Sequence, residues 1–386
     1  MRDAAPEAVR VRDGVGARLE QLLEDLAAWV AVDTPGGDIA ALDGLAVTLA
    51  ETASRFGLEP ELVPTPAGLY LHAHLRGAGR AKVALLCHHD TVYAAGTAAA
   101  RPFRREGDRC YGPGVADMKG GIAVALYAAG LLATGQRPFG HVEVVCCPDE
   151  ESRPAPHATI DRLAGFDAVL CLECGRPNGA VVSARKGATW LRVFAEGRAA
   201  HAGEAPGSGR NVAHALAREA LRVAELSGGR EGLTLQITGL EAGEGLNTVP
   251  SSGSLTADVR APTQADLDWV EATIRNFGEY DGITFRYEDL GGPPPLERTP
   301  AVAALAGAAI ELGARLGHDF GEAVAGGVSD GSWTASTGLP TLDGLGPVGG
   351  DDHSPLEYVE TASFAPRCGV VAGLVAAVDG GLLAAL

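Results

Sequence analysis

The chain has 386 residues, of which 46% are hydrophobic and 21% charged, and its formal net charge at pH 7 is -18. This composition is typical of a globular protein, and the length favours two domains over a single hydrophobic core. The acidic balance argues against a nucleic-acid partner, because phosphate binding needs clustered lysine and arginine, and we find no apolar run long enough to suggest a membrane partner.

The seven cysteines indicate the compartment. Their number is odd and most lie inside apolar runs, so we expect reduced thiols in a cytoplasmic protein. Residues 1–16 are polar and lack the apolar core of a signal peptide. Cys171 and Cys174 have the spacing of a redox pair, but they close an expected strand instead of opening a helix, so we favour a structural role.

The first half of the chain alternates between helical and extended patterns. The expected helices cover 18–32, 38–55 and 122–134, and the expected strands cover 69–75, 83–87, 142–147 and 168–172. The helix over 122–134 is apolar on all sides, as for a helix buried against a sheet. The alternation predicts an α/β fold whose mostly parallel sheet carries helices on both faces.

The pattern changes after residue 186. Strands over 189–195, 233–238, 254–259 and 283–287 and helices over 211–226 and 263–277 give the order β-α-β-β-α-β. This is the split βαβ arrangement of an α+β ferredoxin-like domain. Helices return at 299–316 and 370–378. We therefore expect an α/β domain made of residues 1–186 and 298–386, interrupted by an inserted domain over residues 187–297.

Polar side chains follow three of the expected parallel strands. His88 and Asp90 come after the strand at 83–87, Glu150 and Glu151 after the strand at 142–147, and Glu173 after the strand at 168–172. The carboxyl ends of parallel strands share one edge of a sheet, where ligands bind. Asp117 lies in a glycine-rich turn that leads into a helix. A histidine and several carboxylates at one edge favour a divalent cation, above all zinc.

Within this group the residue types suggest different roles. Because strand side chains alternate, His88 shares a face with Asp90, which can orient the imidazole, whereas His89 points the other way. Adjacent carboxylates repel, so we expect Glu151 or Glu150 to bind metal and the other to act as general base.

Each motif alone also has a structural interpretation. A histidine at a strand end is often part of the core, Asp117 can cap a helix, and the two glutamates can be solvated charges. Lys119 is expected to be solvated or ion-paired. His201 and His353 lie in glycine-rich loops, where either can simply cap or pack.

Taken together, the motifs resemble the dinuclear-zinc exopeptidase and aminoacylase superfamily, which includes glutamate carboxypeptidase (carboxypeptidase G), acetylornithine deacetylase and succinyl-diaminopimelate desuccinylase. The resemblance rests on six motifs in chain order: His88-x-Asp90, Gly114-Val-Ala-Asp-Met-Lys-Gly-Gly121, Glu150-Glu151, Glu173, His201-Ala-Gly and His353. It is greatest to the carboxypeptidase G branch, through residues 87–93, 184–187 and 258–260.

The resemblance implies two zinc ions per chain, for which Co²⁺ or Mn²⁺ can substitute. Asp117 would bridge both ions. Glu151 and His353 would complete one site, and His88 and Glu173 the other. Glu150 would be the general base and Asp90 would orient His88. The Asp117–Met118 peptide bond is expected to be cis, as in many family members.

The resemblance also assigns roles to the inserted domain. This domain would form a homodimer and lend His201 to the partner's active site, where it would stabilise the oxyanion. Asn247 and Arg260 would hold the carboxylate of the substrate.

The implied reaction is amide hydrolysis by zinc-bound water with Glu150 as general base. The expected enzyme is a carboxypeptidase that releases a C-terminal amino acid, with glutamate one candidate, from a small peptide or N-acyl conjugate. The alternatives are an N-acyl-amino-acid deacylase, a biosynthetic deprotecting amidohydrolase and, more remotely, a non-catalytic binding protein.

Overall fold

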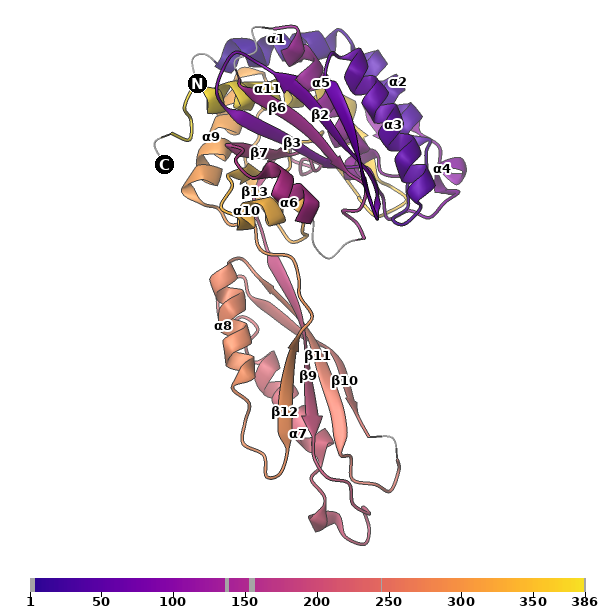
Figure 1. Cartoon of the computed structure of the whole chain (residues 1–386), viewed down its shortest axis with the longest axis vertical. Coiled ribbons are helices and arrows are strands. Elements are labelled where there is room, and N and C mark those ends of the chain that lie inside the picture. The colour runs from indigo at the N-terminus through magenta and orange to yellow at the C-terminus, as the bar shows by residue number, and fades with distance from the viewer. Residues whose placement is uncertain (1–3, 136–138, 153–156, 244, 385–386) are drawn as a thin grey trace. The chain divides into compact units, whose positions relative to one another are not determined.

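The computed structural model describes residues 4–135, 139–152, 157–243 and 245–384 (Figure 1). The chain divides into two compact units. Unit 1 comprises Met1–Ala184, Arg298–Ala325 and Ser329–Leu386, and unit 2 comprises Arg185–Glu297 and Gly326–Val328. Each unit has its own hydrophobic core.

The central sheet of unit 1 has the strand order β1-β2-β6-β3-β7-β14 in the described part of the chain. The pairs β6–β3, β3–β7 and β7–β14 are parallel, whereas β1 and β2 form an antiparallel edge. The strands are β1 (Glu59–Thr65), β2 (Gly68–Arg76), β3 (Lys82–His88), β6 (His141–Cys147), β7 (Ala168–Cys171) and β14 (Thr341–Leu342).

Helices cover both faces of this sheet, as the sequence predicts (Figure 1). Val83, Leu85 and Cys87 of β3 belong to the large core that the long helices share, whereas Ala84 and Leu86 belong to a smaller cluster on the other face. The helices of the large core are α1 (Ala4–Gly16), α2 (Leu19–Val30), α3 (Ile39–Arg55), α5 (Gly120–Ala133), α9 (Pro300–Arg315) and α11 (Phe364–Asp379). The smaller helices are α4 (Thr97–Ala100), α6 (His157–Leu163) and α10 (Asp330–Ser336).

Helix α1 was not predicted, although its sequence carries the signal. Ala4, Ala8, Val11 and Val15 recur at helical spacing and are all buried. The short strands of unit 1 were also missed. They are β4 (Arg104–Glu106), β5 (Arg109–Tyr111), β15 (Gly349–Gly350) and β16 (Tyr358–Glu360), which form one small sheet, and the pair β8 (Val181–Arg185) and β13 (Glu322–Ala325).

Two helical stretches are long and apolar enough to cross a membrane by length and composition alone, whereas no apolar run of that length was expected from the sequence. They are Val115–Ala133 and Thr361–Asp379, and 94% and 83% of their apolar windows are buried inside the protein. Both include core helices of unit 1, α5 and α11. Packing against the sheet and the other helices accounts for their apolar character.

Unit 2 has the split βαβ order β9-α7-β10-β11-α8-β12, and its antiparallel sheet has the strand order β10-β11-β9-β12. Asn211 and Thr263 cap the two helices through their side chains. The elements are β9 (Gly187–Glu196), α7 (Val212–Ala224), β10 (Thr234–Ala242), β11 (Ser252–Ala261), α8 (Gln264–Arg275) and β12 (Thr284–Asp289).

Candidate metal centre

Three parallel strands deliver acidic and imidazole groups to one edge of the central sheet. Strand β3 ends at His88, β6 is followed by Glu150 and Glu151, and β7 is followed by Glu173. These strands are direct neighbours with parallel register, so their carboxyl ends meet. The side chains of His88 and Glu173 are almost fully buried.

Asp117 reaches the same edge from the turn before α5. Gly114 has a φ of 71°, a left-handed conformation that glycine adopts without strain. A Cβ at Gly121 would lie 2.0 Å from the carbonyl oxygen of Leu172, so α5 can begin against the end of β7 only because this residue is glycine. The Asp117–Met118 peptide bond is cis, as expected.

The two carboxylate oxygens of Asp117 meet two different histidines. Oδ1 lies 2.9 Å from Nε2 of His88, and Oδ2 lies 3.1 Å from Nε2 of His353. Oε1 of Glu151 lies 3.2 Å from the same nitrogen of His353, and Oε1 of Glu173 lies 3.6 Å from Nε2 of His88. The structure therefore brings together five residues that lie far apart in the sequence.

Asp90 contacts both neighbouring motifs. Nδ1 of His88 lies 3.1 Å from the backbone oxygen of Asp90 and 3.3 Å from its Oδ1. The carboxylate of Asp90 also accepts the backbone N–H groups of Glu150, at 3.0 Å, and Glu151, at 2.9 Å. It is thus placed to orient the imidazole and to fix the loop that carries the two glutamates, and the second role was not expected from the sequence.

Glu357 was missed by sequence reasoning. Its buried carboxylate accepts the backbone N–H groups of Gly114, Ala116 and Asp117 at 2.9, 2.8 and 3.0 Å, and the hydroxyl of Tyr93 at 2.7 Å. It therefore holds the turn that presents Asp117. A glutamate four residues after His353 in a polar loop gives no sequence signal for this function, because its partners are backbone groups.

The loop that carries His353 is held in an unusual conformation. Asp351 and His353 have φ values of 56° and 60°, which are uncommon for residues other than glycine. The hydroxyl oxygen of Tyr93, which donates to Glu357, also lies 2.9 Å from the backbone oxygen of Ser354, so the two acceptors share one O–H group. The same small network thus supports the turn at Asp117 and the loop at His353.

In the metal-free protein, the surroundings of His88 and His353 raise the pKa of both imidazoles. Burial by itself would lower the pKa of His88, but hydrogen bonds to Asp117 and Asp90 outweigh it and raise that pKa well above its usual range. The hydrogen bond to Asp117 is the main reason that the pKa of His353 rises to about 9. Conversely, these two imidazoles lower the pKa of Asp117 against the effect of its burial.

Three other carboxyl groups of the centre, those of Glu150, Glu151 and Glu173, have raised pKa values. Burial raises the pKa of Glu151 to about 7, and it also raises the pKa values of Glu150 and Glu173 well above the usual range. The charge of Asp117 adds to each of these increases. A cluster of buried acids that repel one another in this way is an arrangement that bound cations would stabilise.

The donor set fits divalent metal ions. Ligand atoms of His88, Asp117 and Glu151 all lie within 4.8 Å of one another. Imidazole and carboxylate are the ligands of catalytic zinc. Because Glu151 lies near both histidines, the structure does not separate the ligands into the two sets that the resemblance implies.

The other expected site residues belong to unit 2. His201 and Asn247 lie in neighbouring segments, since the N–H of Ala202 donates to the backbone oxygen of Asn247 at 2.8 Å. Nδ1 of His201 accepts the backbone N–H groups of Gly203 and Glu204 at 3.2 and 3.1 Å. Nε2 of the exposed His201 ring must then carry the proton, which makes it a hydrogen-bond donor.

Arg260 is at the other end of β11. An extended strand rises about 3.3 Å per residue, so Arg260 lies roughly 26 Å from Ser252, where the strand begins, and Asn247 lies beyond that end. Nε and one amino group of Arg260 pair with Asp258, each at 3.0 Å. Within one chain, Arg260 is therefore not brought together with Asn247.

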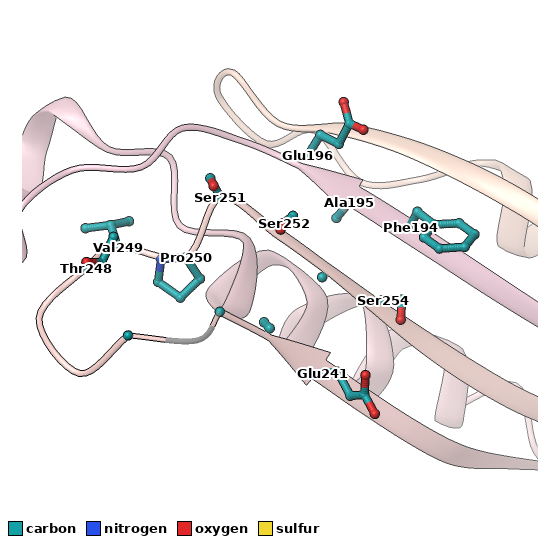
Figure 2. A pocket seen from close by; sticks show the side chains of 14 residues that line it. Phe194, Ala195, Glu196, Glu241, Thr248, Val249, Pro250, Ser251, Ser252 and Ser254 are labelled. Carbon is teal, nitrogen blue, oxygen red and sulfur yellow. The ribbon is translucent and has the colours of Figure 1, made fainter.

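A cavity of about 580 Å³ lies beside the segment that carries Asn247 (Figure 2). Its lining comes from unit 2 alone and includes Glu196 of β9 and Glu241 of β10. The remaining lining consists of Phe194, Ala195, Ala242, Gly243, Gly245, Thr248, Val249, Pro250, Ser251, Ser252, Gly253 and Ser254.

Three further expectations concern residues near the centre. Lys119 is not solvated, because it is buried, and within the described residues its ammonium forms no salt bridge but donates to the backbone oxygen of Val32 at 2.7 Å. Burial lowers its pKa to about 8. Burial lowers the pKa of His89 to about 4, so this residue is neutral at pH 7. Cys171 and Cys174 are not joined by a disulfide bond and lie in different hydrophobic clusters, which favours the structural interpretation.

The chain is similar to a known protein family, to characterised relatives and to solved structures. The model of a family described as Peptidase family M20/M25/M40 matches residues 84–377. Carboxypeptidase G2 from Pseudomonas sp. is 30% identical over 310 residues, which cover 78% of this chain and 75% of that protein. Succinyl-diaminopimelate desuccinylase from Bordetella parapertussis is 28% identical over 343 residues, covering 82% of this chain and 88% of that protein.

Solved structures share the fold at lower identity. Aminopeptidase PepT from Bacillus cereus has a TM-score of 0.75 and 19% identity, with 93% of this chain and 98% of that chain covered. A dinuclear metal-binding peptidase of the M20 family from Bacillus subtilis has a TM-score of 0.72 and 15% identity, with 95% and 99% covered. These likenesses extend over both units of the chain.

Proposed function

The chain belongs to the peptidase family M20/M25/M40, and we propose that it is a dinuclear zinc carboxypeptidase that releases a C-terminal amino acid from a peptide or N-acyl conjugate. The family membership confirms the expected resemblance and the expected hydrolase class. One observation carries the proposal. The two oxygens of Asp117 face the imidazoles of His88 and His353, which is how a carboxylate shared by two metal ions is arranged.

We assign two zinc ions to each chain, and Co²⁺ or Mn²⁺ can substitute. Asp117 would contact both ions, with His88 and Glu173 on one side and Glu151 and His353 on the other. When bound, the ions would lower the pKa of the attacking water and polarise the scissile carbonyl. Asp90 supports the assignment, because the second nitrogen of a metal-binding imidazole commonly faces a carboxylate or a backbone oxygen.

Glu150 is the general base in this proposal. Its backbone N–H is fixed by Asp90, and it follows the same strand as Glu151. Glu150 takes the proton of the attacking water as the new carbon–oxygen bond forms. It then returns that proton to the leaving nitrogen as the amide bond breaks.

His201 acts on the oxyanion that develops at the carbonyl. Its protonated Nε2, fixed by the two backbone donors at Nδ1, provides the hydrogen bond that such a charge requires. The resemblance implies that this group acts in the active site of a partner chain, so we propose a homodimer formed through unit 2.

Arg260 and Asn247 bind the carboxylate of the substrate. The guanidinium suits a carboxylate because it can donate two parallel hydrogen bonds. Their positions at opposite ends of β11 imply that the two residues reach one substrate from different chains. Asn247 would accompany His201 from the partner, and Arg260 would act within its own chain.

The substrate class follows from the chemistry of the site and from the relatives. The similarity to carboxypeptidase G2 supports a carboxypeptidase activity, with glutamate as one candidate for the released amino acid. The desuccinylase relative favours the second candidate, an N-acyl-amino-acid deacylase or a biosynthetic deprotecting amidohydrolase. Peptides, N-acyl conjugates and N-acyl amino acids are all small molecules, so we propose a small-molecule substrate and no nucleic-acid or membrane partner. The buried cysteines, which form no disulfide bonds, support a cytoplasmic location.

A panel of N-acyl amino acids and dipeptides ending in Glu, Asp, Lys, Arg or Leu tests the proposal. We expect release of one class of C-terminal amino acid, abolished by a chelator and restored by zinc. Release of succinate or acetate with no preference for the C-terminal residue would favour the deacylase. A zinc-loaded, folded protein that cleaves no amide in the panel would contradict the carboxypeptidase and leave the biosynthetic and binding alternatives.

A further inference from the structure

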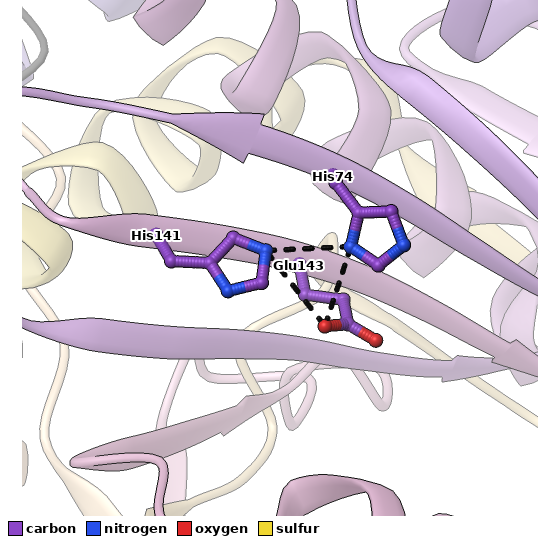
Figure 3. Close-up of side chains that lie close together, drawn as sticks. All are labelled: His74, His141 and Glu143. Atoms are coloured by element: carbon purple, nitrogen blue, oxygen red, sulfur yellow. Dashed lines mark hydrogen bonds and ion pairs between the residues drawn. The ribbon is translucent and has the colours of Figure 1, made fainter.

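A second group of metal-ligand residues lies on the central sheet, and Figure 3 shows its three side chains. His74 on β2 pairs directly with Glu143 on β6, and His141 lies two residues before Glu143 on the same strand. Since strand side chains alternate, all three project from one face. His141 begins β6, and about 20 Å of strand separates it from Cys147 at the other end, which leads to the glutamate pair.

The three potential ligand atoms converge on one point. Nδ1 of His74 lies 3.3 Å from Nε2 of His141 and 3.4 Å from Oε2 of Glu143, and the last two atoms are 3.8 Å apart. A point equidistant from three atoms so spaced is about 2.0 Å from each, which is the bond length of zinc to imidazole nitrogen or carboxylate oxygen. The group could therefore bind zinc without any movement of the strands.

The surrounding contacts leave these atoms as the available ligands. Oε1 of Glu143 already accepts from Nε of Arg162 at 3.0 Å and lies 2.9 Å from Nδ1 of His72, whereas Oε2 faces the other histidines. Nε2 of His74 lies 3.4 Å from Oε2 of Glu61. A carboxylate on the far nitrogen of an imidazole is the usual partner of a metal-binding histidine.

The group is also accessible. The side chain of Glu143 is 2% exposed, but those of His74 and His141 are 14% and 15% exposed. An ion can thus enter from solvent beside the imidazoles while the carboxylate stays buried, and a water molecule can complete its coordination.

We propose that His74, His141 and Glu143 form a third zinc site, separate from the centre at Asp117. Two imidazoles, one carboxylate and one open position suit zinc, and Ni²⁺ or Cu²⁺ can compete for it. The ion would join β2 to β6, the antiparallel pair at the edge of the sheet. The inference stands on these contacts alone and does not depend on the proposed hydrolase activity.

Arg162 is the natural competitor of this ion. It contacts Glu143, lies 2.9 Å from Oε2 of Glu61, and approaches Nε2 of His74 to 3.2 Å. A purely ionic network centred on Arg162 would explain the same contacts without metal. The two explanations differ in one respect: removal of Arg162 should strengthen zinc binding at the proposed site.

Zinc content per folded chain, measured by mass spectrometry after dialysis, separates the two sites. We expect three zinc ions in the wild type and two in His74→Gln/His141→Gln. The matched control His214→Gln removes an exposed histidine on α7 and should leave the count unchanged. If the centre at Asp117 binds no zinc and only the proposed third site does, the wild type would hold one ion and His74→Gln/His141→Gln would hold none.

A cobalt titration isolates the third site. In His88→Ala/His353→Ala, which disables the other centre, we expect one Co²⁺ per chain with the intense visible absorption of four-coordinate cobalt. Arg162→Gln in this background should lower the dissociation constant at least threefold. The proposal would be overturned, in favour of the ionic network, by equal zinc content in the wild type and His74→Gln/His141→Gln. It would equally be overturned if folded His88→Ala/His353→Ala gave no saturable cobalt signal.

Discussion

Replacement of Glu357 by glutamine tests how the site is held in place. Oε1 of the carboxylate accepts hydrogen bonds from the backbone N–H groups of Ala116 and Asp117. Oε2 accepts from the backbone N–H of Gly114 and from the hydroxyl of Tyr93. In Glu357→Gln one oxygen can keep two of these bonds, but the amide group then faces the N–H of Gly114. The tyrosine hydroxyl can rotate and accept, whereas the backbone N–H has no such option.

The cost follows from the bonds that are lost. A hydrogen bond to a charged group contributes roughly 1.5–3 kcal/mol, and a buried donor left unpaired costs a similar amount. We therefore expect Glu357→Gln to lower the free energy of unfolding by about 2–4 kcal/mol. Because the turn presents Asp117, zinc affinity should also fall, by about 10- to 100-fold, as is typical when a group that supports a ligand is changed.

Urea unfolding and zinc competition with a chromogenic chelator measure the two effects. Glu360→Gln is the matched control: this half-exposed carboxylate pairs with Arg109 at 3.3 Å, and its loss should cost about 0–1 kcal/mol without changing zinc affinity. If Glu357→Gln resembled this control in both measurements, the role assigned to Glu357 would be refuted.

The remaining predictions concern the proposed chemistry. Glu150→Gln should retain zinc and stability but lose activity by at least 100-fold, which is the lower end of the usual contribution of a general base. Glu151→Gln should lose metal as well as activity. A kcat near that of the wild type in Glu150→Gln would show that Glu150 is not the base. Mixed dimers of inactive His201→Ala and inactive Glu150→Gln chains should regain activity, and no recovery after proven subunit exchange would show that His201 does not act across the dimer. The metal-free protein should lose stability as pH rises from about 5 to 9. The folded-state pKa values of Glu151 and His353, about 7 and about 9, exceed the ordinary values of 4.5 and 6.5, so these two groups bind more protons in the folded chain than in the unfolded chain within this window. Zinc should reverse the trend, because its ligands must be deprotonated, and thermal unfolding with and without zinc checks both slopes. A midpoint that rises with pH in the metal-free protein would contradict this assignment.

The fold was predictable where hydrophobic patterns are long. The central strands, the buried helix α5 and the split βαβ order of unit 2 follow from apolar periodicity, and the structure has them. The small sheet of β4, β5, β15 and β16 was not predictable in this way. Its strands have only two or three residues, so no period can be recognised.

The centre itself shows the same limit. His88, Glu150 and Glu173 could be anticipated because each follows an apolar strand, and the resemblance added His353. Glu357 could not, because its partners are backbone N–H groups that exist only once the turn is folded. The convergence of His74 and His141 was equally hidden, since it depends on the antiparallel register of β2 and β6.

The most direct test of the central claim is the zinc content of Asp117→Ala in the His74→Gln/His141→Gln background. Because one carboxylate is proposed to contact both ions, its removal should reduce the content from two zinc ions per chain to none under the same dialysis. Retention of both ions at unchanged affinity in a folded protein would contradict the shared role of Asp117 and, with it, the dinuclear centre.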